Sequence, residues 1–456
     1  MTGTLMVGVS GIRGLVDRDL TPEIVRRYAT AFGTWAREHR PLVVVGRDSR
    51  ASGPRFAEAV LAGLGAAGCK SIDVGLVPTP TVQLAVTYHG AGGGIAITAS
   101  HNPIEWNALK FIGPDGIFLD GESGARVLDL VARGPDGRGV MSPPTVDPGA
   151  VERHLAGVLA LTALDVERMR ARHFRVALDA VRGAGGPVMR ALLERLGCAV
   201  VGINLETDGA FPRAPEPVPE NLGDLAALVR RSGADLGMAV DPDVDRLAIV
   251  DERGTAIGED YTLAFAVRAV LGDGAAPSTA AVRRVVVCNL STSLVVADAA
   301  RECGAEVVRT PVGEAHVARA ITELGAPIGG EGNGGVIYPA LHAGRDAPVA
   351  GALILEFLAR GGAQVSEAVA MAPRYAIVKA KVPRGADLDQ VYRALKRRFP
   401  EAATDEQDGL RLGWRDRWLH VRPSNTEPII RLIAEAPGAD LAQELIEEGR
   451  RLCAAS

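Results

Sequence analysis

The sequence predicts an α/β protein in which three related strand–helix–strand units precede a strand-rich α+β unit. Three observations support this prediction. An apolar strand, an amphipathic helix and a second strand follow one another three times along the chain. A glycine stands just past each of the three helices, at Gly68, Gly197 and Gly304. The length of 456 residues implies about three or four domains, and 47% apolar residues can fill several separate cores.

The three units lie in residues 42–76, 174–204 and 283–310. Each opens with a continuous apolar run, which is typical of a strand buried on both faces of a parallel sheet. The glycine after each helix can adopt the left-handed conformation that ends a helix, and the next strand follows at once. The repeated order indicates duplicated domains.

The last part of the chain has an α+β pattern. In order it contains a strand, a helix, two strands and a final helix, at residues 375–382, 388–399, 418–424, 429–436 and from Asp440 onward. Pro and Gly cluster near residues 134–150 and 361–373, as in domain linkers, and a further boundary is expected near residues 251–258. We therefore expect four domains, at residues 1–150, 151–252, 253–368 and 369–456.

The charge of the chain excludes two classes of partner. The chain has 50 Lys+Arg and 55 Asp+Glu, a net charge of −5, whereas nucleic-acid and anionic-membrane binders need a concentrated positive face. We expect neither a membrane span nor a secretory signal. Five well-separated cysteines, an odd number, are typical of reduced thiols. A cytoplasmic protein with a small-molecule partner is therefore expected.

The first candidate motif is TASHNP, residues 98–103, which follows an apolar strand. We expect Ser100 to lie on an exposed turn, because Pro103 bars continuation into a helix. An N-cap serine is an equally good interpretation. A hydrolase triad is not expected, since His101 adjoins Ser100 and cannot easily turn back on it as a general base. His101 is instead expected to orient or neutralise a group bound at Ser100.

The second motif is DPDVDR, residues 241–246, at the end of another apolar strand. The carboxylates of Asp241, Asp243 and Asp245 converge only if the backbone loops around a common point, and they repel unless a cation sits among them. Ligands that are all oxygen favour Mg²⁺ or Ca²⁺ over Zn²⁺. A solvated acidic turn is the alternative, and the apolar flanks count against it. An EF-hand is not expected, because Arg246 stands where that loop needs glycine.

The third motif is the glycine-rich segment GGEGNGG, residues 329–335. Its glycines allow close approach of the backbone to a ligand, and Glu331 can accept hydrogen bonds from sugar hydroxyls. The segment lacks the spacing of a nucleotide-binding loop, and a flexible hairpin is an equally good interpretation.

The fourth motif is RPSNTEP, residues 422–428, with Arg431 beyond it. Hydroxyls, an amide, backbone N–H groups and guanidinium groups in one turn suit a phosphate dianion. A plain turn rich in Ser and Asn is the alternative.

Together these motifs resemble those of the α-D-phosphohexomutases, the family of phosphoglucomutase, phosphomannomutase and phosphoglucosamine mutase. TASHNP resembles the family's phosphoserine loop, DPDVDR its metal loop, GEGNGG its sugar-specificity loop and RPSNTEP its phosphate loop. The opening SGIRG, residues 10–14, is similar to the N-terminal signature. The resemblance implies three tandem related α/β domains with mixed sheets and a C-terminal α+β domain, heart-shaped around a central cleft.

The resemblance also implies a reaction and assigns residues to it. A hexose 6-phosphate would be converted reversibly to its 1-phosphate through a 1,6-bisphosphate, with Ser100 carrying a phosphate. The expected Mg²⁺ ligands are Ser100, Asp241, Asp243 and Asp245. The residues expected at the reacting phosphate are Arg13, His101, Lys110, which is also implied in acid/base work, and Arg246. The residues expected at the distal phosphate are Arg422, Ser424, Asn425 and Thr426, with Arg431 nearby.

Three positions in the predicted sugar site depart from the family pattern. Asn333 stands where many members have Ser, and Gly335 where many have His; Asn333 resembles the members that act on amino sugars. Glu314, after Gly313, stands where bifunctional phosphomannomutase/phosphoglucomutases tend to have His. Its carboxylate could meet the ammonium of glucosamine phosphate, a contact worth about 1.5–3 kcal/mol. Capping of the helix that begins there is an equally good interpretation.

These departures favour phosphoglucosamine mutase, which converts glucosamine 6-phosphate to glucosamine 1-phosphate. A bifunctional phosphomannomutase/phosphoglucomutase is the alternative within the family. A non-catalytic phosphosugar-binding homologue and a phosphatase that uses Ser100 are alternatives outside its activity. We expect Mg²⁺ as the cofactor, a hexose 1,6-bisphosphate as activator, phosphosugars as partners, no nucleic acid or membrane partner, and a monomer or homodimer.

Overall fold

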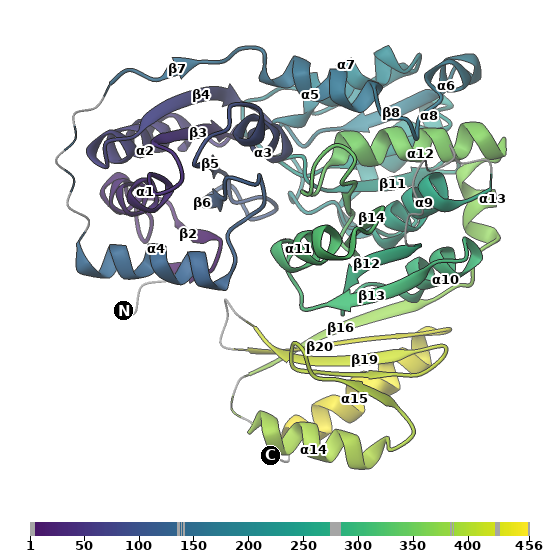
Figure 1. The fold of residues 1–456 in the computed structure, drawn as a ribbon. Helices are drawn as coiled ribbons and strands as arrows, with labels where there is room; N and C mark the ends of the chain where they lie inside the picture. The colour runs from purple at the N-terminus through teal and green to yellow at the C-terminus, as the bar shows by residue number, and fades with distance from the viewer. Residues whose placement is uncertain are drawn as a thin grey trace.

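A computed structural model shows four successive units, each built on its own β-sheet (Figure 1). It describes residues 5–134, 137, 139, 142–273, 284–383, 385, 387–424 and 429–454. We name the units domains I to IV after the predicted boundaries at residues 150, 252 and 368. Within the described residues, no helix combines the length and apolar character needed to cross a membrane.

Domain I contains a mixed sheet of seven strands in the order β1-β2-β6-β5-β3-β4-β7. The strands are β1 (Met6–Gly8), β2 (Gly11–Leu15), β3 (Leu42–Arg47), β4 (Lys70–Leu76), β5 (Gly93–Ile97), β6 (Trp106–Ile112) and β7 (Thr145–Val146). The helices are α1 (Pro22–Ala36), α2 (Gly53–Ala66), α3 (Thr79–Tyr88) and α4 (Gly121–Arg133). Val43 and Val45 of β3 pack in one apolar cluster and Val44 in another, so this strand is buried on both faces, as its continuous apolar run predicts.

Domains II and III repeat the central part of this sheet. Domain II has β8 (Arg175–Asp179), β9 (Ala199–Ile203), β10 (Leu236–Val240) and β11 (Leu247–Asp251). Its helices are α5 (Ala150–Leu159), α6 (Val166–Arg172), α7 (Gly185–Arg195) and α8 (Gly223–Ser232), with the 3₁₀ helix η1 (Pro219–Asn221). Domain III has β12 (Val285–Asn289), β13 (Glu306–Thr310), β14 (Ile328–Glu331) and β15 (Gly335–Ile337). Its helices are α9 (Asp260–Leu271), α10 (Leu294–Glu302), α11 (Glu314–Leu324), α12 (Ala347–Gly361) and α13 (Val365–Ala370).

The strand order β4-β3-β5-β6 of domain I recurs as β9-β8-β10-β11 in domain II and as β13-β12-β14-β15 in domain III. In each case three parallel strands are followed by one antiparallel strand. The three predicted helix-ending glycines, Gly68, Gly197 and Gly304, have φ of +76°, +82° and +66°. The prediction of three related α/β domains with mixed sheets is confirmed.

Domain IV is an antiparallel sheet with two helices on one face (Figure 1). Its strand order is β16-β20-β19-β18-β17. Its elements are β16 (Ala376–Pro383), α14 (Leu388–Arg398), β17 (Ala403–Asp405), β18 (Leu410–Gly413), β19 (Trp418–Pro423), β20 (Ile429–Ala436) and α15 (Ala439–Ala454). The predicted α+β pattern of this unit is confirmed.

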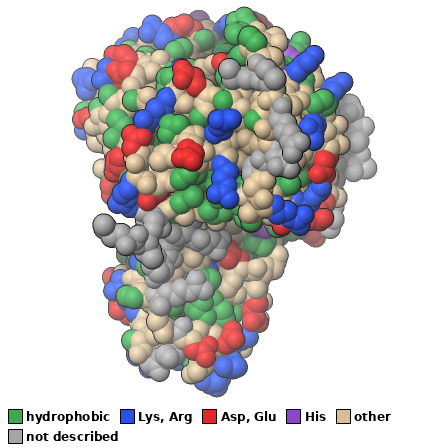
Figure 2. All heavy atoms as spheres, turned by 90° about the vertical axis from the view of Figure 1, so that its left-hand side faces the viewer, with side chains coloured by type: hydrophobic (Ala, Val, Ile, Leu, Met, Phe, Trp, Pro, Cys, Tyr) green, Lys and Arg blue, Asp and Glu red, His purple; other side chains and the backbone are tan. Residues whose placement is uncertain are grey.

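The apolar cores tie the domains together unequally. Leu192 of α7, Phe265 of α9 and Leu355 of α12 belong to one continuous cluster, so domains II and III share a core. The domain IV cluster, which includes Leu419 and Ile446, is separate from it. Figure 2 shows acidic and basic side chains interspersed over the described part of the face that domain I presents, without a concentrated positive patch on that face.

Candidate active site

Three of the motif loops occupy the same place in the three repeated domains. Each follows the last parallel strand of its sheet and precedes the antiparallel strand: residues 98–105 between β5 and β6, 241–246 between β10 and β11, and 332–334 between β14 and β15. Thr79 N donates to Asp243 O at 2.9 Å, and Leu247 N donates to Gly334 O at 3.0 Å, so the loop of domain II contacts both neighbouring domains. The duplicated topology thus brings the hydroxyl, carboxylate and glycine-rich motifs together.

Ser100 lies in a buried loop, and its hydroxyl faces domain II. Its Oγ donates a hydrogen bond to Asp241 Oδ2 at 2.7 Å, and the residue is 3% exposed. The expectation of an exposed turn is wrong, because the carboxylates of domain II cover the hydroxyl. The N-cap interpretation is also wrong, since the strand β6 follows this loop. Ser100 has φ of +48°, a left-handed backbone that is rare for a residue with a side chain.

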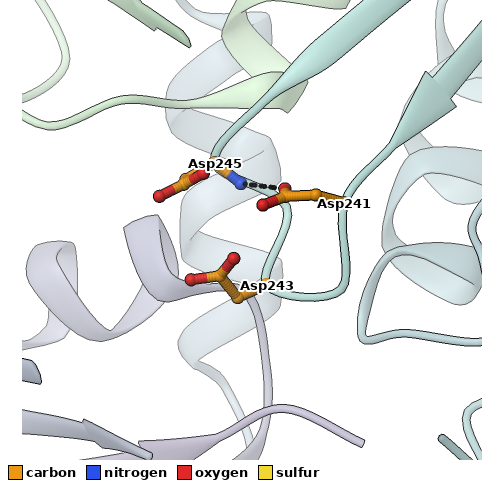
Figure 3. A group of neighbouring side chains, drawn as sticks. All are labelled: Asp241, Asp243 and Asp245. Atoms are coloured by element: carbon orange, nitrogen blue, oxygen red, sulfur yellow. Dashed lines mark hydrogen bonds between the residues drawn. The ribbon is translucent and has the colours of Figure 1, made fainter. Parts of the chain in front are cut away.

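Asp241, Asp243 and Asp245, the aspartate cluster, meet around one point (Figure 3). Each residue offers a carboxylate oxygen within 4.8 Å of the others, and all three residues are buried, which excludes a solvated turn. Asp241 Oδ1 accepts the N–H groups of Asp245 and Arg246, both at 3.2 Å. Asp243 Oδ1 and Asp245 Oδ1 are buried and accept no hydrogen bond from the described part of the chain. Buried carboxylate oxygens that accept no hydrogen bond fit Mg²⁺ or Ca²⁺.

The charges of the aspartate cluster are only partly compensated by protein groups. Burial, and then the neighbouring Asp245 and Asp243, raise the pKa of Asp241 well above its usual range. Burial also acts to raise the pKa of Asp243, but the charge of Lys110 and the hydrogen bonds from Lys110, Thr79 and Asp241 together outweigh it, and the pKa of Asp243 is lowered. Lys110 Nζ lies 2.7 Å from Asp243 Oδ2 and 3.4 Å from Asp245 Oδ2. A divalent cation among the three carboxylates would relieve this repulsion.

Three further predicted residues surround the Ser100 loop. Arg13 Nη1 donates to Asn102 Oδ1 at 2.6 Å, which ties β2 to this loop. His101 Nδ1 lies 3.4 Å from Ser100 Oγ. Arg246 Nε lies 3.7 Å from Asp245 Oδ1. The charge of Arg246, followed by burial, lowers the pKa of His101 well below its usual range, so this ring is neutral near neutral pH.

Glu331 ends β14 and is 3% exposed. Its Oε1 accepts hydrogen bonds from Asn289 Nδ2 at 2.8 Å and from Gly313 N at 3.1 Å. Its Oε2 accepts from Arg345 Nη1 at 2.7 Å and from Asn333 Nδ2 at 3.5 Å. Two separately predicted parts of the sugar site, Gly313 and the glycine-rich segment, are thus in direct contact.

Glu314 begins α11 and is buried against Arg345. Its Oε2 lies 3.0 Å from Arg345 Nε, and its Oε1 accepts from Arg345 N at 3.1 Å and from Gln83 Nε2 at 3.4 Å. Glu314 is thus the acidic residue in the first turn of α11, whose N-cap is Gly313, and its carboxylate is bound by Arg345 and Gln83. Burial raises the pKa of Glu314, although the charge of Arg345 opposes this shift.

The phosphate loop belongs to domain IV. Arg422 on β19 pairs in register with Arg431 on β20, which pairs with Lys381 on β16. Side chains of directly paired residues share one face of a sheet, so these three cations form a row. Arg422 Nε lies 2.9 Å from Asp408 Oδ2, and Ser424 is buried. The predicted residues Asn425 and Thr426 lie outside the described residues.

Four family models match the chain in succession. The phosphoglucomutase/phosphomannomutase α/β/α domains I, II and III match residues 4–136, 152–254 and 259–375, and the C-terminal domain of the same family matches residues 377–452. The chain belongs to the phosphoglucomutase/phosphomannomutase family. The resemblance predicted from the four motifs is confirmed.

Individual relatives of this phosphohexomutase span nearly its whole length. The "Phosphoglucomutase/phosphomannomutase" of Thermococcus kodakarensis is 38% identical over 459 residues, which cover 98% of both chains. The "Probable phosphoglucosamine mutase" of Methanopyrus kandleri is 38% identical over 451 residues, 97% of this chain and 96% of that one. The crystal structure of a phosphoglucomutase/phosphomannomutase family protein from Burkholderia thailandensis matches with a TM-score of 0.83 at 28% identity, over 99% of this chain and 98% of that one. The predicted fold and the class of enzyme, a phosphomutase and thus an isomerase, are confirmed.

Two buried arginines of this phosphohexomutase were not predicted from the sequence. The first, Arg50, is fully buried. Its guanidinium donates to Asp48 Oδ2 and to the carbonyl oxygens of Ser100, Asn102, Pro103 and Trp106, at 2.6 to 3.1 Å. Arg50 thereby fixes the backbone of the Ser100 loop. The pair Asp48 and Arg50 directly after the buried strand β3 is the signal that could have found it. The second arginine is Arg345.

Proposed function

We propose that this phosphohexomutase interconverts hexose 6-phosphate and hexose 1-phosphate through a phosphoserine at Ser100 and a hexose 1,6-bisphosphate, which also serves as activator. The observation that carries the proposal is the 2.7 Å hydrogen bond from Ser100 Oγ to Asp241 Oδ2, across the contact between domains I and II. It sets a hydroxyl able to carry a phosphoryl group against carboxylates suited to a divalent cation. Both groups are buried, which keeps water from a phosphoserine that it would hydrolyse.

The aspartate cluster would hold Mg²⁺, with an oxygen of phosphorylated Ser100 as a further ligand. Bound there, Mg²⁺ would neutralise charge on the phosphoryl oxygens during transfer. The chain prepares Asp243 for this role, because Thr79 Oγ1 and Lys110 Nζ both donate to its Oδ2 at 2.7 Å. Its Oδ1 accepts no hydrogen bond from the described residues and remains for a ligand.

The cations at Ser100 would position the reacting phosphate. A phosphoserine carries about −1.5 to −2 charges, and Arg13, Arg246 and Lys110 offer positive charge around it. Burial acts to lower the pKa of Lys110, but Asp243 and Asp245 outweigh it and the pKa is raised. Lys110 therefore remains a cation that can neutralise the reacting phosphoryl oxygens, and its acid/base role is assigned by the resemblance to the family. The side chain of His101, whose pKa is lowered by Arg246 and by burial, is within reach of Ser100 Oγ to orient it.

Domain IV would hold the distal phosphate, which does not react. Arg422 and Ser424, with Arg431 beside them, would bind its oxygens; Asn425 and Thr426 are assigned by the resemblance of the motif. The bisphosphate must turn end for end between the two transfers. One set of cations on a sheet face suits this task, because it can bind either phosphate by charge.

For the sugar we propose glucosamine phosphate, on the basis of Asn333 and Glu314 and of the name that the Methanopyrus kandleri relative carries. A neutral hexose, mannose or glucose, is the second candidate. The observation that favours it is the binding of Glu314 by Arg345 and Gln83, because an ammonium group would have to share that carboxylate.

We further propose a cytoplasmic enzyme, monomeric or homodimeric, acting on phosphosugars and not on nucleic acid or membranes. All five cysteines are free thiols in the structure, which is consistent with a reducing compartment.

A substrate panel tests the proposal. The values of kcat/KM for glucosamine, mannose and glucose 6-phosphates are compared in the presence of Mg²⁺ and glucose 1,6-bisphosphate. We expect 1-phosphate products and a preference for glucosamine 6-phosphate of about tenfold or more, from one charge-assisted contact. A preference for a neutral sugar discards the amino-sugar assignment alone. Free phosphate in excess of 1-phosphate indicates a phosphatase, and no product from any sugar favours the non-catalytic homologue.

A further inference from the structure

Arg345 lies at the centre of a buried charge cluster that joins domain III to the aspartate cluster of domain II. Its Nη1 donates to Glu331 Oε2 at 2.7 Å and its Nη2 to Asp245 Oδ2 at 2.6 Å. Its Nε lies 3.0 Å from Glu314 Oε2. All four side chains are buried. One guanidinium thus compensates three carboxylates that come from three separate segments of the chain.

The backbone around Arg345 is held on both sides. Arg345 N donates to Glu314 Oε1 at 3.1 Å, and the residue forms an isolated β-bridge with Ile337. The next residue, Asp346, caps α12 by accepting Val349 N at 2.9 Å, and its Oδ2 lies 2.8 Å from His154 Nε2. The backbone of Arg345 is therefore fixed, which sets the position of its guanidinium before any ligand binds.

Gly335 provides the space that the Arg345 side chain fills. A Cβ at Gly335 would lie 2.2 Å from Arg345 Cδ and 3.0 Å from Arg345 Cγ. Carbon atoms do not approach that closely, so any side chain at position 335 would displace Arg345. The glycine of the sugar loop and the arginine before α12 are thus structurally dependent on each other.

We propose that Arg345 is a positioning residue that sets the affinities for the sugar phosphate and for Mg²⁺ together. The inference rests on the proposed function. Arg345 orients Glu331 for the sugar hydroxyls, and it holds Asp245 Oδ2 while Asp245 Oδ1, which accepts no hydrogen bond from the described residues, remains for the cation. A planar guanidinium can serve three carboxylates at once, whereas an ammonium is a single point of charge.

The variant Arg345→Lys tests the inference while keeping a positive charge. Mg²⁺ alone, and then the best substrate of the panel, are titrated into the full-length protein by calorimetry, without turnover. We expect both dissociation constants to rise, by roughly 10–100-fold, as for residues that orient metal ligands. Asn289→Ala is the matched comparison, because Asn289 Nδ2 bonds Glu331 but no aspartate of the cluster. It should weaken sugar binding and leave Mg²⁺ binding unchanged.

A second variant, Gly335→Ala, keeps the arginine but displaces it, and should weaken both affinities in the same way. Arg360→Lys is the control for loss of an arginine elsewhere in the fold, since the half-buried Arg360 bonds carbonyl oxygens of α9. It should leave both affinities unchanged.

The inference is overturned if Arg345→Lys lowers the melting temperature but leaves both affinities intact, or if it weakens either affinity alone. Its failure can be told apart from failure of the proposed function. If the wild-type protein turns over no hexose phosphate, the proposed function fails. The Mg²⁺ titration of Arg345→Lys still reports on the contact with Asp245.

Discussion

The two regions that would hold the two ends of the substrate are constructed differently. Around Ser100, groups from separate domains interlock: Ser100 bonds Asp241, and Lys110 bonds Asp243. In domain IV, Arg422 pairs with Asp408 of its own domain, and the phosphate-loop cations lie in a row on one sheet face. The first region is a closed three-dimensional cluster; the second is a patch of charge.

The contact between domains III and IV includes direct polar bonds, although domain IV has an apolar core of its own, as domain I does. Val312 N donates to Asp408 Oδ2 at 3.1 Å, and Ser291 Oγ lies 2.9 Å from His420 Nδ1. The difference teaches that phosphoryl transfer needs fixed atomic positions, whereas holding a spectator phosphate needs charge that tolerates two orientations of the sugar.

The largest effect is expected from Asp243→Asn, in the cluster around Ser100. Loss of this carboxylate removes a proposed Mg²⁺ ligand and the main partner of Lys110. We expect kcat to fall by roughly 100-fold or more, and the Mg²⁺ concentration for half-maximal activity to rise. The measurement is kcat as a function of Mg²⁺. Asp224→Asn, an exposed aspartate on α8, is the control and should change neither. An unchanged Mg²⁺ dependence in Asp243→Asn would refute the metal assignment.

A smaller effect, on KM and not on kcat, is expected from Arg422→Ala, in the row of cations of domain IV. The distal contact persists from the ground state to the transition state, so KM should rise while kcat changes little. Loss of hydrogen bonds to a charged group predicts a rise of about tenfold or more. Steady-state kinetics measure both constants, with Arg398→Ala on α14, which pairs with Glu448, as the control. A fall in kcat with KM unchanged would contradict the comparison.

A third effect, which concerns stability and not activity, is expected at the contact between domains III and IV. Burial lowers the pKa of His420 to about 4. In the unfolded chain the imidazole of His420 takes up a proton near pH 6.5. In the folded protein the same imidazole stays neutral until the pH is much lower. The free energy of unfolding should therefore decrease as pH falls from about 6.5 to about 4, by up to about 1.4 kcal/mol per pH unit.

The His420→Asn variant, which does not titrate, isolates this contribution. Urea unfolding of both proteins is measured from about pH 7.5 to about pH 4.5, across the expected window. The wild-type protein should lose stability faster than the variant as pH falls. Equal pH slopes for the two proteins would show that His420 is not excluded from protonation.

The sequence predicted the regular parts of the fold because their patterns are local. The apolar run at β3 and the left-handed Gly68 after α2 are decided by nearest neighbours, and the structure has both. The contact between the TASHNP loop and the DPDVDR loop was predicted from the resemblance to the family, in which these motifs occur in the same order. Equivalent loops of duplicated domains then converge in the structure, which explains that order physically.

The sequence did not predict which charges would be buried together. Arg345 and Glu314 are 31 residues apart and Arg345 and Asp245 are 100 apart, and no local pattern marks them as partners. The absence of a local signal for distant partners also explains the wrong expectation that Ser100 is exposed. Its exposure depends on a neighbouring domain, which a turn motif does not describe.

The account depends on Ser100 carrying the phosphate, and mass spectrometry tests this most directly. The protein is incubated with glucose 1,6-bisphosphate and Mg²⁺. Its intact mass is then measured, and the modified residue is located by peptide mapping. We predict one phosphoryl group, located on Ser100 and absent from an inactive Ser100→Ala variant. A phosphate on another residue, or a Ser100→Ala variant that turns over normally, would contradict the account.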